Sequence, residues 1–311
     1  MAKGKSSKKK KVSTEITPEE RSYNTANANW FPGHMIKAMT KIKENLRLVD
    51  IVLEVRDSRS PLVTSNLSFT DTITQKPRLI VFNKANLADS EVITLWKEWL
   101  SKNGDNFIFI NALDKKSVNK IVQLSKEIVK KKSEDELSSK AKLKMMIIGL
   151  PNTGKSTIIN SLSNRNASKV ADKPGQTQKE LWVKASGDLD ILDTPGVMPP
   201  IINNREQALQ LSALNAISER IMDAEETACF LVEHLLKNNA EQVKEHFKIE
   251  NLTNDLVETL NQIAQARGCI LKKNEFDYER VYKVVINDFR KGCFGPVSLE
   301  QPPKEVQEQG L

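Results

Sequence analysis

The chain has 311 residues, of which 39% are hydrophobic and 28% are charged. This length and composition suffice for the cores of one large or two ordinary domains and exclude a chain that is disordered throughout. Its longest apolar runs are far shorter than the roughly 20 residues of a membrane-spanning helix, so we expect no membrane partner.

The net charge of the chain is +7, and the N-terminus carries a run of lysines. Such a run favours a polyanionic partner such as RNA, although a solvated tail that only aids solubility has the same composition. The segment lacks the apolar stretch of a secretory signal, and the three cysteines form no Cys-x-x-Cys pair. We therefore expect a cytoplasmic protein without a disulfide framework or a zinc site.

Strands and helices alternate in the predicted elements of the first two-thirds of the chain. Residues 1–24 are polar, charged and aperiodic, which predicts a disordered basic tail. Periodicity then predicts strands at 50–57, 78–84, 107–112, 143–149, 180–186 and 189–193 and helices at 36–49, 90–102, 118–132 and 155–162. This alternation predicts an α/β domain over residues 25–200, with a mostly parallel six-stranded sheet.

The strand signal disappears after about residue 205. Two runs of apolar residues at helical spacing, 253–268 and 276–292, each stop at a glycine, and Thr253 or Asn254 is the expected N-cap of the first run. The sequence therefore predicts a small all-α domain over residues 201–300 and a flexible tail over residues 301–311.

A phosphate-binding loop is the clearest motif. The stretch "GLPNTGKS", residues 149–156, has the pattern Gly-x4-Gly-Lys-Ser between a predicted strand and a predicted helix. In this motif the lysine, Lys155, reaches the β- and γ-phosphates, and the hydroxyl of Ser156 binds Mg²⁺. The predicted nucleotide contacts are Gly149, Pro151, Asn152, Thr153, Gly154, Lys155, Ser156 and Thr157.

Two further motifs follow at the spacing of a GTPase. The stretch "LDTPG" places Asp193 where a carboxylate holds the water shell of Mg²⁺, and Gly196 where an N–H faces the γ-phosphate. Between the two motifs, "PGQTQ" supplies the hydroxyl of Thr177 for the same Mg²⁺. We therefore predict Lys155 and Thr177 as catalytic residues, and Ser156, Thr177 and Asp193 as magnesium ligands.

The guanine-recognition motif comes before the phosphate loop instead of after it. Asn83-Lys84-x-Asn86 is close to Asn-Lys-x-Asp, with Asn86 in place of the aspartate. The expected roles are support of the base and the loop by Asn83 and Lys84, and contact with the guanine oxygen by Asn111, Ala112 and Leu113. The motif order is that of a GTPase after circular permutation, and residues 118–142 are long enough to join the former termini.

Asn86 leaves the choice of base open. Guanine presents two donors, and an aspartate accepts both, whereas an asparagine accepts one and turns its own amide toward the other. On the order of 1.5 to 3 kcal/mol is at stake for such a charge-assisted hydrogen bond. Xanthine suits an asparagine better, and Asp89 does not compensate because it is the expected N-cap of the next helix.

From "WFPGHM" to "GPVSLE", the chain resembles the circularly permuted GTPases of the ribosome biogenesis GTPase A family. The resemblance implies GTP and GDP as ligands, Mg²⁺, and the large-subunit precursor with its rRNA and ribosomal proteins as partners. It also implies that His34 orients the attacking water, since Val197 replaces the glutamine of Ras-type enzymes, and that Asn152 holds K⁺. Basic residues expected on an RNA-binding face are Arg267, Lys272, Lys273, Arg280, Lys283, Arg290 and Lys291.

Two alternatives remain open at this stage. An RNA-binding scaffold that holds nucleotide with little useful hydrolysis is compatible with Asn86. An ATPase is compatible with the phosphate loop, although nothing in "NKAN" favours adenine. A further expectation follows from the permutation: the segment after Gly196 leads directly into the helical domain, so the nucleotide state can be transmitted to that domain.

Overall fold

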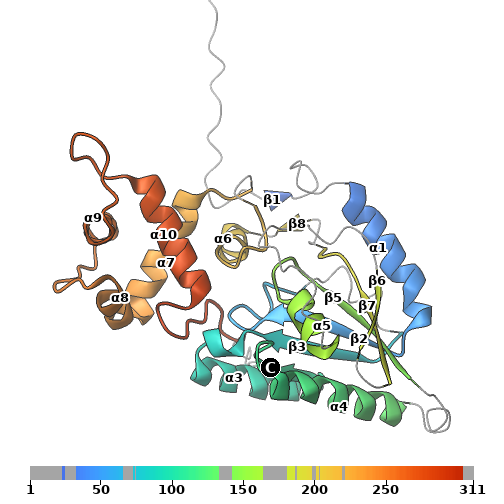
Figure 1. Ribbon diagram of the computed structural model, residues 1–311. Coiled ribbons are helices and arrows are strands. Elements are labelled where there is room, and N and C mark those ends of the chain that lie inside the picture. Colours follow the sequence, from blue (N-terminus) through green and yellow to red (C-terminus); the bar gives the residue numbers. More distant parts are fainter. Residues whose placement is uncertain are drawn as a thin grey trace, which may run out of the picture.

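The structure is a computed structural model of the chain. It describes residues 23–24, 33–65, 73, 75–132, 142–163, 181–185, 188–197, 201–202, 204–218 and 221–303. Within these residues a sheet of six strands precedes a bundle of helices, and Figure 1 shows α6 (Arg205–Ala213) between the two.

The sheet confirms the predicted mostly parallel architecture. Its strand order is β4-β3-β2-β5-β7-β6, and every neighbouring pair is parallel except β6 with β7. The strands are β2 (Ile51–Asp57), β3 (Arg78–Asn83), β4 (Phe107–Phe109), β5 (Leu143–Gly149), β6 (Leu181–Lys184) and β7 (Leu189–Asp193). Because carboxyl ends of parallel strands meet at one edge, the ends of β2, β3, β5 and β7 converge there.

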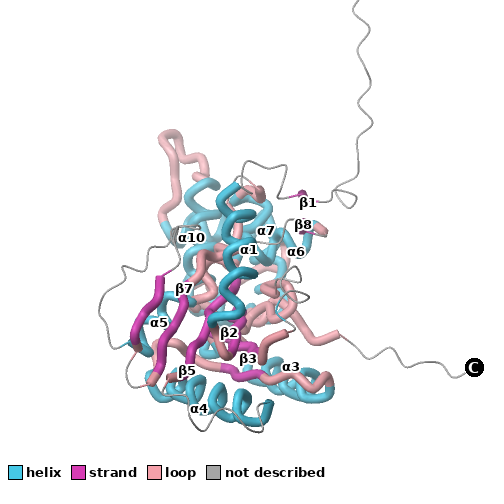
Figure 2. The backbone as a smooth tube through the Cα atoms, turned by 90° about the vertical axis from the view of Figure 1, so that its right-hand side faces the viewer, coloured by secondary structure: helices cyan, strands magenta, loops and turns pink. Residues whose placement is uncertain are grey.

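Helices cover both faces of this sheet. They are α1 (Gly33–Asn45), α3 (Ser90–Lys102), α4 (Lys115–Lys132) and α5 (Lys155–Ser163), with short 3-10 turns η2 (Leu46–Leu48) and η3 (Ala85–Leu87). Alternate residues of β2 face opposite ways: Val52 packs in one core with α1 and α6, and Leu53 packs in the other with α4 and α5. Figure 2 accordingly shows the strands between α1 and α4.

The remaining helices form the predicted all-α region. They are α7 (Ala224–Asn238), α8 (Ala240–Phe247), α9 (Leu256–Arg267) and α10 (Tyr278–Lys291). The expected N-cap of α9 was wrong by one or two positions, because the carboxylate of Asp255 accepts the backbone N–H of Glu258 at 2.8 Å. Asp89 does cap α3 as expected, by accepting from the N–H groups of Glu91 and Val92.

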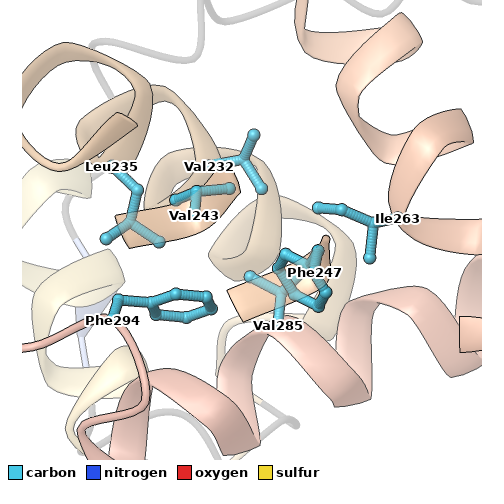
Figure 3. Close-up of a pocket in the computed structure, with 7 residues that line it drawn as sticks. All are labelled: Val232, Leu235, Val243, Phe247, Ile263, Val285 and Phe294. Atoms are coloured by element: carbon cyan, nitrogen blue, oxygen red, sulfur yellow. The ribbon is translucent and has the colours of Figure 1, made fainter. Parts of the chain in front are cut away.

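The interior of the bundle is packed with apolar side chains. Figure 3 shows its apolar side chains meeting around Phe247 and Phe294, and the cavity volume between them is about 0 Å³. None of the helices in the described ranges is both long and apolar enough to cross a lipid bilayer. The last two residues of the segment expected to be a disordered tail, residues 1–24, form a strand instead. This strand, β1 (Tyr23–Asn24), pairs antiparallel with β8 (Ile201–Ile202).

Candidate nucleotide-binding site

The phosphate loop, residues 149–156, connects β5 to α5 at the carboxyl edge of the sheet. Its backbone has positive φ at Gly149 (148°), Asn152 (59°) and Gly154 (98°). A Cβ at Gly154 would collide with the side-chain amide of Asn83, and one at Gly149 would collide with the carbonyl of Val55. The two glycines are therefore required by close approach as well as by conformation.

Lys155 is a buried cation at the base of this loop. Its Nζ donates hydrogen bonds to the carbonyl oxygens of Leu150 at 2.7 Å and Gly149 at 3.2 Å. Burial lowers the pKa of Lys155 to about 8, and the charge of Asp193 opposes that shift. Gly196 lies against the same loop, since a Cβ there would come within 3.2 Å of the lysine Nζ. Neutral carbonyls compensate a buried ammonium only partly, so the site favours an anion.

Asp193 ends β7 beside Lys155, and its environment fits a bound cation. Its Oδ1 is buried and has no hydrogen-bond partner within the described parts of the chain. Burial raises the pKa of the Asp193 carboxyl, and the charge of Lys155 opposes the shift. A buried, unpartnered carboxylate oxygen is costly unless a cation meets it, so Asp193 suits Mg²⁺. Of the other two predicted magnesium ligands, Ser156 lies in the first turn of α5. Thr177 lies outside the described residues.

Asn83 joins the base-recognition motif to the phosphate loop. Its Nδ2 donates to the carbonyl of Thr153 at 2.9 Å, and its Oδ1 accepts the N–H of Ala112 at 2.9 Å. One buried side chain thus holds three predicted binding segments together. Around it, Leu113 is 81% exposed, and Asn86 is exposed within η3. The Asn111 side chain accepts the N–H of Leu113 at 3.0 Å.

Lys84 reaches in two directions. Its Nζ donates to the carbonyl of Asn152 at 2.7 Å and to Oδ2 of Asp57 at 2.8 Å. Asp57 is 1% exposed at the end of β2, and Arg59 donates to both of its oxygens. Burial disfavours the charged form, but the charges of Arg59 and Lys84 outweigh it and hold the pKa of Asp57 below its usual range.

The sequence analysis missed Asp57. The available signal was an aspartate at the carboxyl end of a buried strand, in "EVRDSRSP", beside the strands that carry the other motifs. Such a position lies at the ligand-binding edge of an α/β sheet. The stretch "VDIVLEVRDSRSP" also belongs to the part of the chain that resembles the family, but the resemblance was not used to give Asp57 a role.

The helical region touches both ends of this site. Asn152, the predicted potassium ligand, donates from Nδ2 to the carbonyl of Asn215 at 2.7 Å, just after α6. At the other end, the N–H of Val297 donates to the carbonyl of Leu87 at 2.9 Å, within η3. The backbone of His34 lies in the first turn of α1, and its side chain is outside the described part.

Three of the seven residues expected on the RNA-binding face, Arg267, Arg280 and Arg290, have structural partners. Nη1 of Arg280 donates to the carbonyl of Gly268 at 3.4 Å. The guanidinium of Arg290 donates to the carbonyls of Ser212 at 2.8 Å and Ala213 at 3.0 Å, at the end of α6. Arg267 pairs with Asp288 at 3.1 Å. The expected assignment of Arg290 is therefore corrected, because this partly buried guanidinium already donates to carbonyls at the carboxyl end of α6. The exposed residues among the seven are Arg267, Lys272, Lys273, Arg280, Lys283 and Lys291.

Comparisons with known proteins agree with this geometry. A protein-family model described as 50S ribosome-binding GTPase matches residues 144–279. Ribosome biogenesis GTPase A of Bacillus licheniformis is 36% identical over 276 residues, which cover 88% of this chain and 98% of that protein. Mitochondrial ribosome-associated GTPase 1 of Bos taurus is 29% identical and covers 88% of this chain and 89% of that protein.

Solved structures show the same fold. The GNP-bound crystal structure of YlqF from T. maritima matches with a TM-score of 0.60 and 28% identity, covering 86% of this chain and 99% of that chain. A GDP-bound YlqF structure matches with a TM-score of 0.59 and 27% identity, covering 84% and 99%. The chain belongs to the ribosome biogenesis GTPase A family, and it is a GTP-hydrolysing enzyme.

Proposed function

We propose that this GTPase acts in assembly of the large ribosomal subunit, and that its helical domain binds ribosomal RNA and responds to the bound nucleotide. Its relatives support the ribosomal role by their names, and its family model is described as 50S ribosome-binding. The observation that carries the coupling is the hydrogen bond from Asn152 Nδ2 to the carbonyl of Asn215. It joins the phosphate loop to the start of the helical domain.

Nucleotide phosphates enter the loop and replace the carbonyl partners of Lys155. The ammonium then pairs with the β- and γ-phosphates, and Gly196 offers its N–H to the γ-phosphate. Mg²⁺, when bound, neutralises charge on the phosphates, and we assign its ligands as Ser156, Asp193 and Thr177. Asn152 retains its side-chain oxygen for K⁺ while its amide group bonds to Asn215.

The base lies against Asn83, Lys84 and η3 in this proposal, with Asn86 at its edge. Asn86 supplies one acceptor where two guanine donors need partners, and residues 111–113 lie beside the guanine oxygen. Competition of GTP, XTP and ATP against a fluorescent guanine nucleotide tests this arrangement. We expect GTP to bind most tightly and Asn86→Asp to improve GTP affinity about tenfold, which corresponds to about 1.4 kcal/mol. Tighter binding of XTP or ATP than of GTP by the wild type would contradict it.

RNA binding is assigned to the exposed face of α9, α10 and the turn between them. Lys272 and Lys273 project from that turn without a carboxylate partner among the described residues. Exposed lysines in such a position contact phosphates and release counterions, which makes affinity depend on salt. The lysine-rich N-terminus adds charge of the same sign.

The test is GTP hydrolysis with and without large-subunit precursor particles, in potassium and in sodium. We expect stimulation by the particles, a preference for potassium, and loss of turnover without loss of GTP binding in His34→Ala. Replacing Lys272 and Lys273 by glutamine should weaken particle binding, while the same change at the exposed Lys130 and Lys131 of α4 is the matched control. Nucleotide binding without measurable turnover on particles would favour the scaffold alternative.

A further inference from the structure

Asp57 lies at the carboxyl edge of the sheet between the two halves of the nucleotide site. Its strand, β2, is flanked by β3 on one side and β5 on the other. The register pairs Asp57 with Asn83 of the base-recognition motif, and Val55 with Gly149 of the phosphate loop. The carboxylate is thus placed where it can act on both motifs, although it belongs to neither.

The contact with Lys84 fixes a side chain that is otherwise flexible. A lysine ammonium is a point charge with three donors on a four-carbon stem, so its position depends on fixed acceptors. Here the acceptors are Oδ2 of Asp57 at 2.8 Å and the carbonyl of Asn152 at 2.7 Å. Together they hold the stem of Lys84 across the base side of the site and tie it to the phosphate loop.

Asp57 pairs with the charge of Arg59, but this pairing alone does not explain why Lys84 also contacts Asp57. Arg59 already makes two hydrogen bonds to Asp57, from Nε and Nη2, each 2.9 Å long. The Lys84 ammonium is added to that bidentate pair. Burial lowers the pKa of Lys84 and the charge of Asp57 opposes this shift, and with Lys84 protonated the three-residue cluster carries a net positive charge. A cluster that served only to pair buried charges would not need the second cation. Next to a site for a polyanion, the excess charge has a use.

We propose that Asp57 is a positioning residue for nucleotide binding, which acts by holding Lys84 between the base and the phosphate loop. The inference rests on the nucleotide site proposed above. It predicts that Asp57 contributes to GDP and GTP affinity only while Lys84 is present. Arg59, by contrast, braces the helical domain: its guanidinium lies 5.0 Å from the ring centre of Phe289, and its carbonyl accepts the N–H of Leu299 at 2.8 Å.

A double-mutant cycle on GDP affinity tests this division. The proteins are the full-length wild type, Asp57→Asn, Lys84→Met and the double variant, with thermal unfolding measured for each. We expect Asp57→Asn to weaken GDP binding about 10-fold to 100-fold, the range of one or two charge-assisted hydrogen bonds. In the Lys84→Met background the same change should alter affinity by less than about twofold.

Equal losses in both backgrounds would show that Asp57 acts on the fold and would overturn the inference, as would an unchanged affinity in Asp57→Asn. The variant Arg59→Met tests the inference independently, and it does so even if Asp57→Asn does not fold. It keeps the Asp57–Lys84 pair, so GDP affinity should stay within about threefold of wild type while the unfolding temperature falls. A 10-fold or greater loss of affinity there would also overturn the inference. If the wild type bound neither GDP nor GTP, the nucleotide site itself would be refuted.

Discussion

The C-terminal segment, residues 293–300, returns from α10 to the nucleotide-binding domain and ends in a partly buried glutamate. Oε2 of Glu300 accepts the backbone N–H groups of Leu62 at 2.8 Å and Val63 at 3.3 Å. The carbonyl of the same residue accepts Nε1 of Trp96 at 3.3 Å. One residue therefore anchors the segment to two different parts of the domain.

Protonation of Glu300 should control how firmly this segment is held. Burial raises the pKa of Glu300 from 4.5 to about 7, although the N–H groups of Leu62 and Val63 favour the carboxylate. The folded protein thus retains a proton that the unfolded chain releases. The resulting stabilisation is complete below the unfolded pKa of 4.5 and is lost as pH rises through about 7. The difference between the two pKa values corresponds to a change of about 3 kcal/mol at most in the free energy of unfolding.

The assay is urea unfolding between pH 5 and pH 8, followed by tryptophan fluorescence because Trp96 contacts Glu300. Glu300→Gln stays neutral throughout, so the wild type should lose up to about 3 kcal/mol of unfolding free energy relative to this variant over that range. Hydrogen exchange at Leu62 and Val63 should accelerate in parallel. The exposed Glu250→Gln is the matched control. Parallel pH profiles for wild type and Glu300→Gln would refute the assignment.

Three further substitutions probe the site and its support. Gly154→Ala should abolish nucleotide binding in a folded protein, because its Cβ collides with the Asn83 amide; unchanged GDP titration would contradict this. Asp193→Asn should raise the unfolding free energy of the nucleotide-free protein at pH 7 by about 1 to 2 kcal/mol while removing the effect of Mg²⁺ on GTP binding, since it removes a buried unpartnered charge. Arg290→Met should cost about 1 to 3 kcal/mol in urea unfolding, whereas its exposed neighbour Lys291→Met should stay within about 0.5 kcal/mol, and equal costs would count against the Arg290 contacts with α6.

The sheet and its motifs could be predicted because their signals are local. Each strand is a short apolar run with turn residues on both sides, and the phosphate loop combines glycines whose φ values and close contacts leave few alternatives. The order of the motifs in the chain then indicated the permutation, since the base-recognition motif on β3 precedes the phosphate loop. The structure places β5 and this loop next to β2, which separates β5 from β3 in the sheet.

Contacts between distant segments could not be predicted in the same way. Residues 238 positions apart meet when Glu300 accepts the N–H of Leu62. No periodicity or turn signal marks such a pair, and the same holds for Asp57 with Lys84. Arg290 illustrates the converse error. Its charge indicated an RNA contact, but whether a cation faces solvent or the end of another helix depends on packing.

The coupling proposed above, of the helical domain to the bound nucleotide, rests on the permutation and on these distant contacts together. The chain leaves the sheet after Gly196 and enters α6, which packs on the sheet core and presents the carbonyl of Asn215 to the phosphate loop. It returns through residues 293–300, where Val297 bonds to the base-recognition turn at Leu87. In this proposal, a shift at the phosphates and a shift at the base would both reach the same packed bundle, from two sides. Because a packed bundle moves as a unit, the domain should respond to both shifts together, whereas a single contact would report only one of them.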